Sequence, residues 1–415
     1  MEKRPIIFFE PFPTVPVYKI ARLFKERGYR TISLRILESK GLSDEFYKDA
    51  FDRIVSLNID FSKINKKNIN EMLVYVRKNL NRFRKILSYI QKLKPYVIVA
   101  RAEPSLPCAL MKIALRKTPF VYFPYDIRSQ AFKTIKEAKK RRGVNKWEIW
   151  AERFCFEHSG GIMHKGDPEE LKYLNGSMLG NNIKLVQLQI SFLPYCSGEF
   201  NVPINKNKLS KKDKETHMVF IGSIGSVNPS ACNYLLEYFK EIIKQKIHIH
   251  IYTQPNTIPK EEVVSSFKNV WGEITKSKYL HIHEPLGPKE IIREISKYDY
   301  GLWPLDYKLK NPKITLEPKL ATGNKLSSYL EAGIPFFNSP EHEFADKLMA
   351  RYGLSLHFGD LNDSHNLKDR IKKADYKELE KKVIKMRNEF DMDKNFPRLE
   401  KFIRAVVAKK KAQVK

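Results

Sequence analysis

The sequence contains little cysteine and no long uninterrupted hydrophobic run. Only four of its 415 residues are cysteines, and none belongs to a Cys-x-x-Cys pair. This spacing argues against a zinc ribbon or a redox motif and favours isolated buried thiols in a reducing compartment. A membrane-spanning helix needs about 20 apolar residues, but charged residues and prolines interrupt the most apolar stretch, residues 96–115. The N-terminal apolar run ends at Glu10, too early for a signal peptide. We therefore expect a cytoplasmic protein.

Negative charge is scarce relative to positive charge. The chain has 76 lysines and arginines against 47 aspartates and glutamates, which gives a net charge of +29. Such a field attracts phosphates, nucleic acids or anionic lipid surfaces, and it does not distinguish among them. A chain of 415 residues is also too long for one compact core, so two domains are expected.

Short apolar runs alternate with amphipathic stretches in two successive series. The first series of candidate strands is Pro5–Phe9, Thr31–Ile36, Arg53–Leu57, Tyr96–Ala100, Phe120–Phe123, Gly161–Met163 and Leu185–Leu188. The second is Met218–Ile221, Ile247–Tyr252, Tyr279–His283, Tyr300–Trp303, Ile334–Phe337 and Leu354–His357. Strands that alternate with helices predict parallel, doubly wound sheets.

A polar, lysine-rich stretch at residues 195–216 separates the two series and reads as a linker. We therefore predict an α/β protein with two Rossmann-like domains, residues 1–200 and 201–380. A C-terminal helix, residues 381–415, is expected to cross back to the first domain. Because ligands of such sheets bind at the carboxyl ends of the strands, a cleft between the domains is the expected site.

The segment with the clearest chemistry runs from Gly323 to Phe337. Its order is loop, helix, glycine stop and strand, and the first turn of the helix holds four polar residues, Asn324, Lys325, Ser327 and Ser328. Free N–H groups at a helix N-terminus bind phosphate, and a lysine there adds a full positive charge. An ordinary capped helix packed on a sheet explains the same pattern equally well on this segment alone.

Residues 324–335, N-K-L-S-S-Y-L-E-A-G-I-P, resemble the donor-binding hallmark of GT-B glycosyltransferases. Residues 218–225, 281–298 and 298–306 resemble other parts of the same donor domain, and order and spacing agree over about 217–360. The resemblance implies a nucleotide-sugar co-substrate, no further cofactor, a first domain that binds the acceptor and a second that binds the donor. The donor contacts that it implies are Gly222, Ser223, Gly225, Thr253, His283, Asp306, Asn324, Ser327, Ser328 and Glu331.

One position departs from the family pattern. Many retaining members of glycosyltransferase family four carry two glutamates eight positions apart, and here Glu331 fills the second position while Gly323 fills the first. The Asn-Lys-Leu version also resembles inverting GT-B enzymes that build bacterial polysaccharides. Retention and inversion of stereochemistry therefore both stay open.

Two histidine pairs raise the question of a metal. His248 and His250 alternate on one predicted strand, and His281 and His283 alternate on another, so each pair shares a face. A metal site needs a third ligand at suitable spacing, and the sequence shows none. Strand packing is the simpler interpretation. The resemblance likewise implies that helix dipole and basic side chains, rather than a metal, neutralise the leaving diphosphate, with Lys325 in that role.

An inverting transfer also needs a general base for the acceptor hydroxyl. Asp126 follows the predicted strand 120–123 and is our candidate, although a helix cap or an ion pair with Arg128 would explain it too. Glu10, Glu103 and His164 follow other strands and are further candidates.

The acceptor is expected to be a glycan or a lipid-linked glycan. Residues 133–154 are basic and then aromatic, and the predicted helix 71–93 carries basic residues around an apolar stripe. Both suit an anionic membrane surface, and both also suit a solvated charged face beside a core-packing helix. Two other classes remain. A nucleotide-sugar epimerase could use the same fold, and a nucleic-acid-binding protein could use the same charge, although no reader motif is recognisable.

Overall fold

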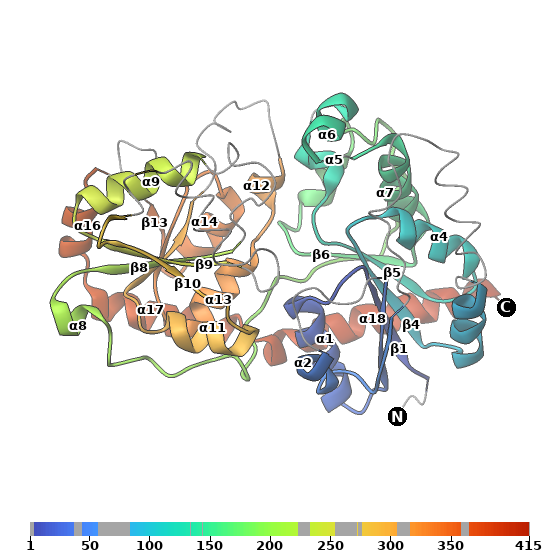
Figure 1. Cartoon of the computed structure of the whole chain (residues 1–415). Coiled ribbons are helices and arrows are strands. Elements are labelled where there is room, and N and C mark those ends of the chain that lie inside the picture. The colour runs from blue at the N-terminus through green and yellow to red at the C-terminus, as the bar shows by residue number, and fades with distance from the viewer. Residues whose placement is uncertain are drawn as a thin grey trace. The chain divides into compact units, whose positions relative to one another are not determined.

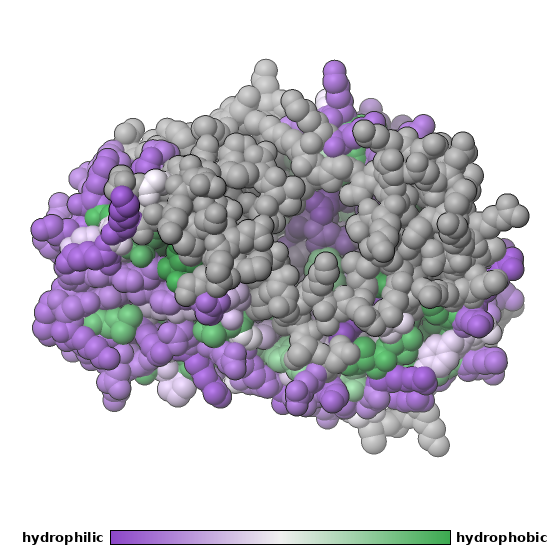
Figure 2. Space-filling view, in the orientation of Figure 1, coloured by the Kyte–Doolittle hydropathy of each residue, from purple (hydrophilic) through white to green (hydrophobic). Residues whose placement is uncertain are grey.

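The computed structural model describes residues 4–36, 44–56, 84–132, 134–142, 144–222, 233–253, 272, 276–304, 316–357 and 365–414. The chain divides into two compact units. The N-terminal unit comprises Met1–Leu193, Lys313–Glu317 and Phe396–Lys415, and the C-terminal unit comprises Pro194–Pro312 and Pro318–Asn395. No helix among the described residues is long and apolar enough to span a bilayer. Hydrophilic side chains cover most of the described surface in the view of Figure 2.

The N-terminal unit is built on a parallel sheet of seven strands in the order β3-β2-β1-β4-β5-β6-β7. The strands are β1 Ile6–Glu10, β2 Thr31–Arg35, β3 Arg53–Ser56, β4 Val97–Ala102, β5 Phe120–Pro124, β6 Gly161–His164 and β7 Gln189–Ser191. Every residue of β1, β2, β4 and β5 is buried. Near-continuous apolar runs of this kind are expected when helices cover both faces of a parallel sheet.

The last strand of this sheet differs from the prediction. Leu185 and Val186 pack as a loop against the core, and pairing with β6 begins only at Gln189, opposite Ile162. Apolar content alone therefore placed the strand a few residues too early. The predicted helix 71–93 is helical over residues 84–93, and its earlier part lies outside the described residues.

Helices lie on both faces of this sheet (Figure 1). The helices are α1 Val15–Glu26, α2 Asp44–Lys48, α4 Leu106–Ala114, α5 Arg128–Ala131, α6 Ile135–Arg142, α7 Lys146–His158 and α18 Met392–Val414, with a 3-10 turn at Glu170–Leu174.

Buried carboxylates of α7 cap two other helices. Glu148 accepts hydrogen bonds from the N–H groups of Ser105 and Leu106 at the start of α4, and Glu152 accepts from those of Arg128 and Ser129 at the start of α5.

Helix α18 packs on the N-terminal unit through close contacts. The ring of Phe396 lies 4.7 Å from that of Phe24 on α1. Farther along, α18 approaches β6 so closely that a Cβ on Gly161 would lie 2.6 Å from Val406 and 2.8 Å from Phe402. Glycine at this position is what lets the C-terminal helix lie against the sheet.

The C-terminal unit has a second parallel sheet, in the order β10-β9-β8-β11-β12-β13. Its strands are β8 His217–Ile221, β9 His248–Tyr252, β10 Leu280–His283, β11 Tyr300–Trp303, β12 Phe336–Asn338 and β13 Leu356–His357. Its helices are α8 Ser210–Asp213, α9 Asn233–Lys244, α11 Pro288–Ile295, α12 Glu317–Leu320, α13 Asn324–Ala332, α14 Glu343–Ala350, α16 Leu367–Lys373 and α17 Tyr376–Glu389. In Figure 1, α9 lies on one side of this sheet and α11, α13 and α17 lie on the other. The two sheets confirm the predicted α/β class with two doubly wound domains.

We expect the substitution Gly161→Ala to destabilise the protein by about 1–3 kcal/mol, the usual cost of an extra methyl group in a full core. The added Cβ would overlap Val406 and Phe402. Gly198→Ala is the matched control, because nothing lies within 4 Å of its added Cβ. Urea unfolding midpoints of both variants provide the measurement, and equal midpoints would contradict the close packing of α18 on β6.

Candidate functional site

The carboxyl edge of the C-terminal sheet is shaped by the contact between α13 and the central strands. The buried hydroxyl of Tyr329 donates to the carbonyl oxygen of Leu302 on β11 at 2.8 Å and lies 3.2 Å from that of Val219 on β8. The ring lies directly over Gly301, where a Cβ would be 2.6 Å from it. Together these contacts hold the N-terminus of α13 beside the ends of β8 and β11.

The helix α13 begins without a side-chain cap. Gly323 occupies the N-cap position, and a Cβ there would lie 2.7 Å from the ring of Trp303. A glutamate, the residue that the resembling family often carries here, therefore has no room at this position. No side-chain cap is present at the start of α13, and the N-terminus of a helix is a favourable place for an anion.

Lys325 places a positive charge at the same point. Its Nζ lies 2.9 Å from the position that a Cβ on Gly222 would take and 5.1 Å from the ring centroid of Phe220, both at the end of β8. Gly222 adopts φ +134, a conformation that favours glycine. Burial lowers the pKa of Lys325 to about 8, and no charged neighbour contributes to that shift. An ammonium that is partly desolvated and unpaired within the described residues marks an anion site.

The other residues predicted to contact the donor differ in their surroundings. Asn324 is exposed at the start of α13, while the hydroxyls of Ser327 and Ser328 both donate back to its carbonyl oxygen. Thr253 is buried just after β9. Ser223, Gly225 and Asp306 lie outside the described residues.

Two further candidates are engaged elsewhere. Glu331 is fully buried, and its carboxylate accepts the N–H of Ser197 at 2.8 Å. Its carbonyl oxygen also accepts the N–H of Val202, so Glu331 holds residues 197–202 against α13. A contact of Glu331 with the donor stays a prediction. His283 ends β10 and shares a 2.9 Å hydrogen bond with His250, while its ring stacks on Tyr252.

The carboxyl edge of the N-terminal sheet carries a cluster of charged residues. Asp126 follows β5 and pairs with Lys165 at 2.8 Å. Burial opposes ionisation of this carboxyl, but Lys165, and then Arg128 and Arg101, outweigh it and hold the pKa of Asp126 below its usual value. Asp126 is consequently a carboxylate at neutral pH.

Two other acids of this edge have different surroundings. Glu103 bonds to both Arg101 and Arg128. Glu10 is fully buried, and its burial raises the pKa to about 8 despite the arginines Arg101 and Arg35 nearby. Glu10 thus holds a proton at neutral pH, which removes it as a base there.

Arg101 is the least expected member of the cluster. Its side chain is only 2% exposed and lies over the rings of Phe12, at 4.7 Å, and Tyr125, at 4.4 Å. Its Nε and Nη1 atoms have no hydrogen-bond acceptor among the described residues. His164, the remaining candidate base, is buried and bonds through Nδ1 to Glu170 at 2.9 Å.

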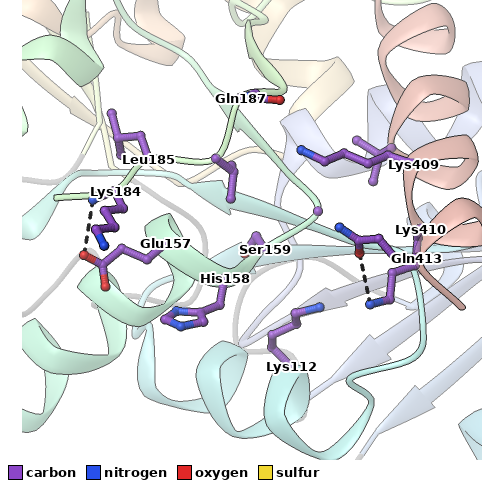
Figure 3. A pocket seen from close by; sticks show the side chains of 13 residues that line it. Lys112, Glu157, His158, Ser159, Lys184, Leu185, Gln187, Lys409, Lys410 and Gln413 are labelled. Atoms are coloured by element: carbon purple, nitrogen blue, oxygen red, sulfur yellow. Dashed lines mark hydrogen bonds between the residues drawn. The ribbon is translucent and has the colours of Figure 1, made fainter.

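A second feature of the N-terminal unit is a pocket of about 320 Å³ (Figure 3). Four lysines line it, namely Lys112, Lys184, Lys409 and Lys410. Burial and then the nearby Lys410 lower the pKa of Lys112 to about 8. The loops that precede β6 and β7 form one wall, so the pocket opens at the amino edge of the sheet, opposite Asp126.

Comparisons with known structures identify the fold of this chain. No protein-family model and no curated protein matches the sequence. Sucrose-phosphate synthase from Thermosynechococcus elongatus is 11% identical, with 98% of this chain and 100% of that one covered and a TM-score of 0.66. HepE of Anabaena, solved in complex with UDP, is 10% identical, with 97% and 100% covered and a TM-score of 0.61.

The chain has the GT-B fold. A UDP-GlcNAc 2-epimerase from Methanocaldococcus jannaschii, solved with UDP-GlcNAc and UDP, is similar as well. It is 13% identical, with 89% of this chain and 93% of that one covered and a TM-score of 0.51. At such identities the likeness concerns the fold.

Some residues of this GT-B chain could not be found from spacing. Arg101 lies near the end of β4 and Lys165 directly follows β6, and only the sheet brings them to Asp126. A signal did exist for Asp213, which ends α8 four positions before His217, the first residue of β8. The structure brings Asp213 within 2.9 Å of His217, so the histidines do have a carboxylate neighbour that sequence reasoning missed.

Replacing Lys325 with methionine is expected to raise the thermal unfolding temperature at pH 7, because it removes a partly buried charge that has no carboxylate partner in the described part of the chain. The lowered pKa means that the folded protein binds this proton more weakly than the unfolded chain does. The penalty is therefore full below about pH 8 and disappears as the pH rises toward the ordinary lysine value of about 10.4. The difference between the two proteins should shrink over that range.

Lys372→Met is the matched control, because Lys372 is an exposed lysine of α16 and should have no such effect. A Lys325→Met protein less stable than wild type at pH 7 would show instead that the ammonium has an anionic partner in the folded chain.

Proposed function

We propose that this protein is a glycosyltransferase that moves a sugar from a nucleotide-sugar donor to a hydroxyl acceptor. The observation that carries the proposal is Lys325, whose ammonium has no carboxylate partner among the described residues and lies beside Gly222 and the start of α13. A diphosphate at this point would meet a positive side chain, the N-terminus of a helix and a glycine that lets the backbone come close. The GT-B fold, which several enzymes of sugar transfer share, supports the same conclusion.

The proposed chemistry separates two roles. The new bond joins the acceptor oxygen to the anomeric carbon of the sugar, and the bond from that carbon to the diphosphate breaks. Lys325 and the N-terminus of α13 stabilise the negative charge that develops on the departing diphosphate. Asp126, ionised at neutral pH, accepts the proton of the acceptor hydroxyl, as an inverting transfer requires.

We further propose that the acceptor is a glycan or a lipid-linked glycan, reached by a cytoplasmic enzyme at an anionic membrane surface. The helix α7 supports this contact. Trp147, Trp150 and Phe154 form a stripe on its outward side, and Trp150 is 42% exposed. Ile149 and Cys155 of α7 are buried in the core and Phe154 packs partly against it, so Trp150 is the member of the stripe most open to solvent.

An epimerase is the second candidate, because the fold of the M. jannaschii epimerase is similar. The two reactions differ in what they need. An epimerase converts its nucleotide sugar alone, whereas a transferase releases a nucleoside diphosphate only as the acceptor gains a sugar. Incubating the protein with each nucleotide sugar, with and without a glycan acceptor, separates them by the products formed.

The decisive experiment combines donor binding with transfer. A panel of nucleotide sugars is first tested for thermal stabilisation, and a true donor at 100 times its dissociation constant should add about 2.7 kcal/mol. With that donor, Lys325→Ala should weaken the stabilisation and lower turnover by about 100-fold or more. Asp126→Asn should keep the stabilisation and lower turnover by about 100- to 10,000-fold.

Glu103→Gln is the control for Asp126→Asn, because it changes another carboxylate of the same edge that bonds to arginines. Near-normal turnover in a folded Lys325→Ala protein would remove the diphosphate role of this lysine. Stabilisation by no nucleotide sugar at all would contradict the proposed function.

Membrane binding is tested with vesicles. We expect the protein to sediment with anionic and not with neutral vesicles, and salt should weaken the binding. Lys139 on α6 and Lys146 at the start of α7 are exposed, and each lysine near an anionic surface contributes about 1 kcal/mol. The double variant Lys139→Glu/Lys146→Glu should therefore bind at least about 30-fold more weakly. The double variant Lys372→Glu/Lys373→Glu on α16 is the charge-matched control. Equal binding to both vesicle types, or none to either, would argue for a soluble acceptor.

A further inference from the structure

Five histidines form an ordered array on one face of the C-terminal sheet. They come from three adjacent strands, and the parallel register pairs His217 with His248 and His250 with His281. Neighbouring rings stack, with centroids 4.3 Å apart for each of these two pairs. The remaining member, His283, ends β10.

Hydrogen bonds divide the array into two chains. In the first, Nδ1 of His217 lies 2.9 Å from Nε2 of His250, and Nδ1 of His250 lies 2.9 Å from Nε2 of His283. In the second, Nδ1 of His248 lies 2.9 Å from Nε2 of His281. Both chains run diagonally across the strands, and both begin at the amino edge of the sheet.

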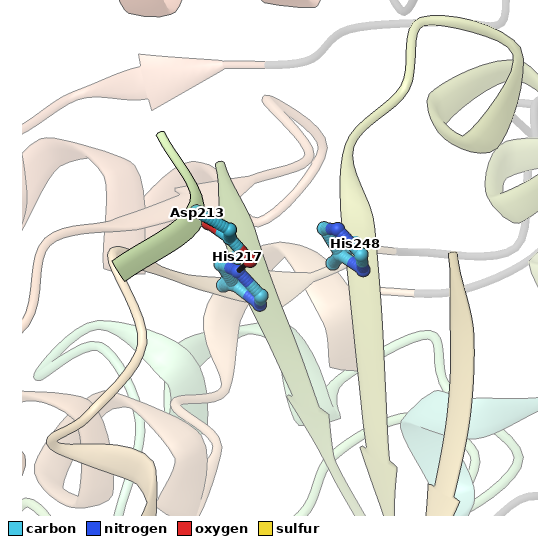
Figure 4. A group of neighbouring side chains, drawn as sticks. All are labelled: Asp213, His217 and His248. Carbon is cyan, nitrogen blue, oxygen red and sulfur yellow. Dashed lines mark hydrogen bonds and ion pairs between the residues drawn. The ribbon is translucent and has the colours of Figure 1, made fainter. Parts of the chain in front are cut away.

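At this amino edge, the first histidine of each chain bonds to a carboxylate. Nε2 of His217 lies 2.9 Å from Oδ2 of Asp213, and Nε2 of His248 lies 2.6 Å from Oε2 of Glu215. Asp213, His217 and His248 each offer a ligand atom, and these three atoms lie within 4.8 Å of one another (Figure 4). Two imidazole nitrogens and the carboxylate of Asp213 thus lie close together, and the carboxylate of Glu215 adjoins His248.

We propose that Asp213, His217 and His248, with Glu215 as a fourth ligand, bind a divalent transition-metal ion of the zinc class. Two nitrogen and two oxygen donors suit the tetrahedral coordination that Zn²⁺ prefers, and imidazole ligands disfavour Mg²⁺ and Ca²⁺. The imidazoles are 6% and 10% exposed, while the carboxylates are 43% and 31% exposed. An ion can therefore enter from solvent through the carboxylates and reach the buried nitrogens.

The rest of the array supplies the outer shell of such a site. Metal-binding histidines characteristically use their second ring nitrogen for a hydrogen bond that fixes the ring. Here the Nδ1 atoms of both proposed ligands are already bonded, to His250 and His281. The proton now shared between each Nε2 and its carboxylate moves to Nδ1 when an ion takes Nε2, and each imidazole behind shifts its own proton in the same sense.

Binding also requires one local movement. The rings of His217 and His248 are nearly parallel, with an interplanar angle of 5°, so their Nε2 lone pairs run side by side instead of converging. A turn of the His248 ring about its side-chain bonds, together with the exposed carboxylates, would close the four ligands around an ion. The backbone of β8 and β9 can stay as it is.

This site differs in place and purpose from the proposed donor site. It lies at the amino ends of β8 and β9, whereas Gly222 and Lys325 lie at the carboxyl end of β8. An ion here would tie α8, β8 and β9 together and would not touch the reacting atoms. The inference is therefore independent of the proposed glycosyl transfer.

The test uses the full chain without a polyhistidine tag, freed of metal by chelation and titrated with Co²⁺. We expect saturable binding of one equivalent, the visible d–d absorption of a tetrahedral ion, and displacement of Co²⁺ by Zn²⁺. Asp213→Asn should weaken binding by at least about 10-fold, since even the loss of an outer-shell partner costs 10- to 100-fold. Because Asp213 is 43% exposed, this variant should fold normally.

Asp346→Asn is the matched control, because Asp346 bonds a different histidine, His357, on the same unit. It should bind Co²⁺ as wild type does. Absence of stoichiometric binding, or equal affinity of Asp213→Asn and wild type, would overturn the proposal. No sugar nucleotide enters the measurement, so its outcome stands apart from the test of transfer.

Discussion

The buried hydroxyl of Tyr329 is the contact on which the geometry of the C-terminal unit depends. It lies within hydrogen-bond distance of backbone carbonyl oxygens of two adjacent strands, β8 and β11. The ring needs a glycine beneath it, which Gly301 provides. Because α13 is fixed in this way, its first turn and Lys325 come to the end of β8. A shift of one helical residue would carry the ammonium away from Gly222.

The two carboxyl edges handle buried charge differently. In the N-terminal unit, Asp126 and Glu103 each have a basic partner, so their charges compensate one another. In the C-terminal unit, Lys325 stands without a carboxylate among the described residues. Partly desolvated charge without a partner lowers stability, and proteins keep it where a ligand provides the missing partner. This contrast is why Lys325 is the proposed contact for the donor diphosphate, while the ionised Asp126 is the proposed base for the acceptor hydroxyl.

The cost of burying polar groups also shapes the histidine array. Imidazoles inside a sheet must find hydrogen-bond partners, since a buried polar atom without one is costly. Burial lowers the pKa of His281 to about 4 and lowers that of His250 as well, so these rings are neutral. Neutral imidazoles satisfy one another along the strands until a carboxylate ends each chain. The carboxylates lie at the solvent edge, where their own charge is hydrated.

Sequence periodicity alone determined the fold class, because apolar strands buried on both faces and helices between them leave few architectures open. It also located the segment from Gly323 to Phe337, whose glycine stop and polar first turn are local properties. The tertiary structure decided what those residues face. Ser327, Ser328 and Glu331 belong to the same segment as Lys325, and only the structure shows that their side chains make hydrogen bonds within α13 and to Ser197. Likewise, Asp213 and His248 are 35 positions apart, and only the pairing of β8 with β9 brings them together. Spacing along the chain reports local structure, whereas distances between strands depend on register, which no single segment contains.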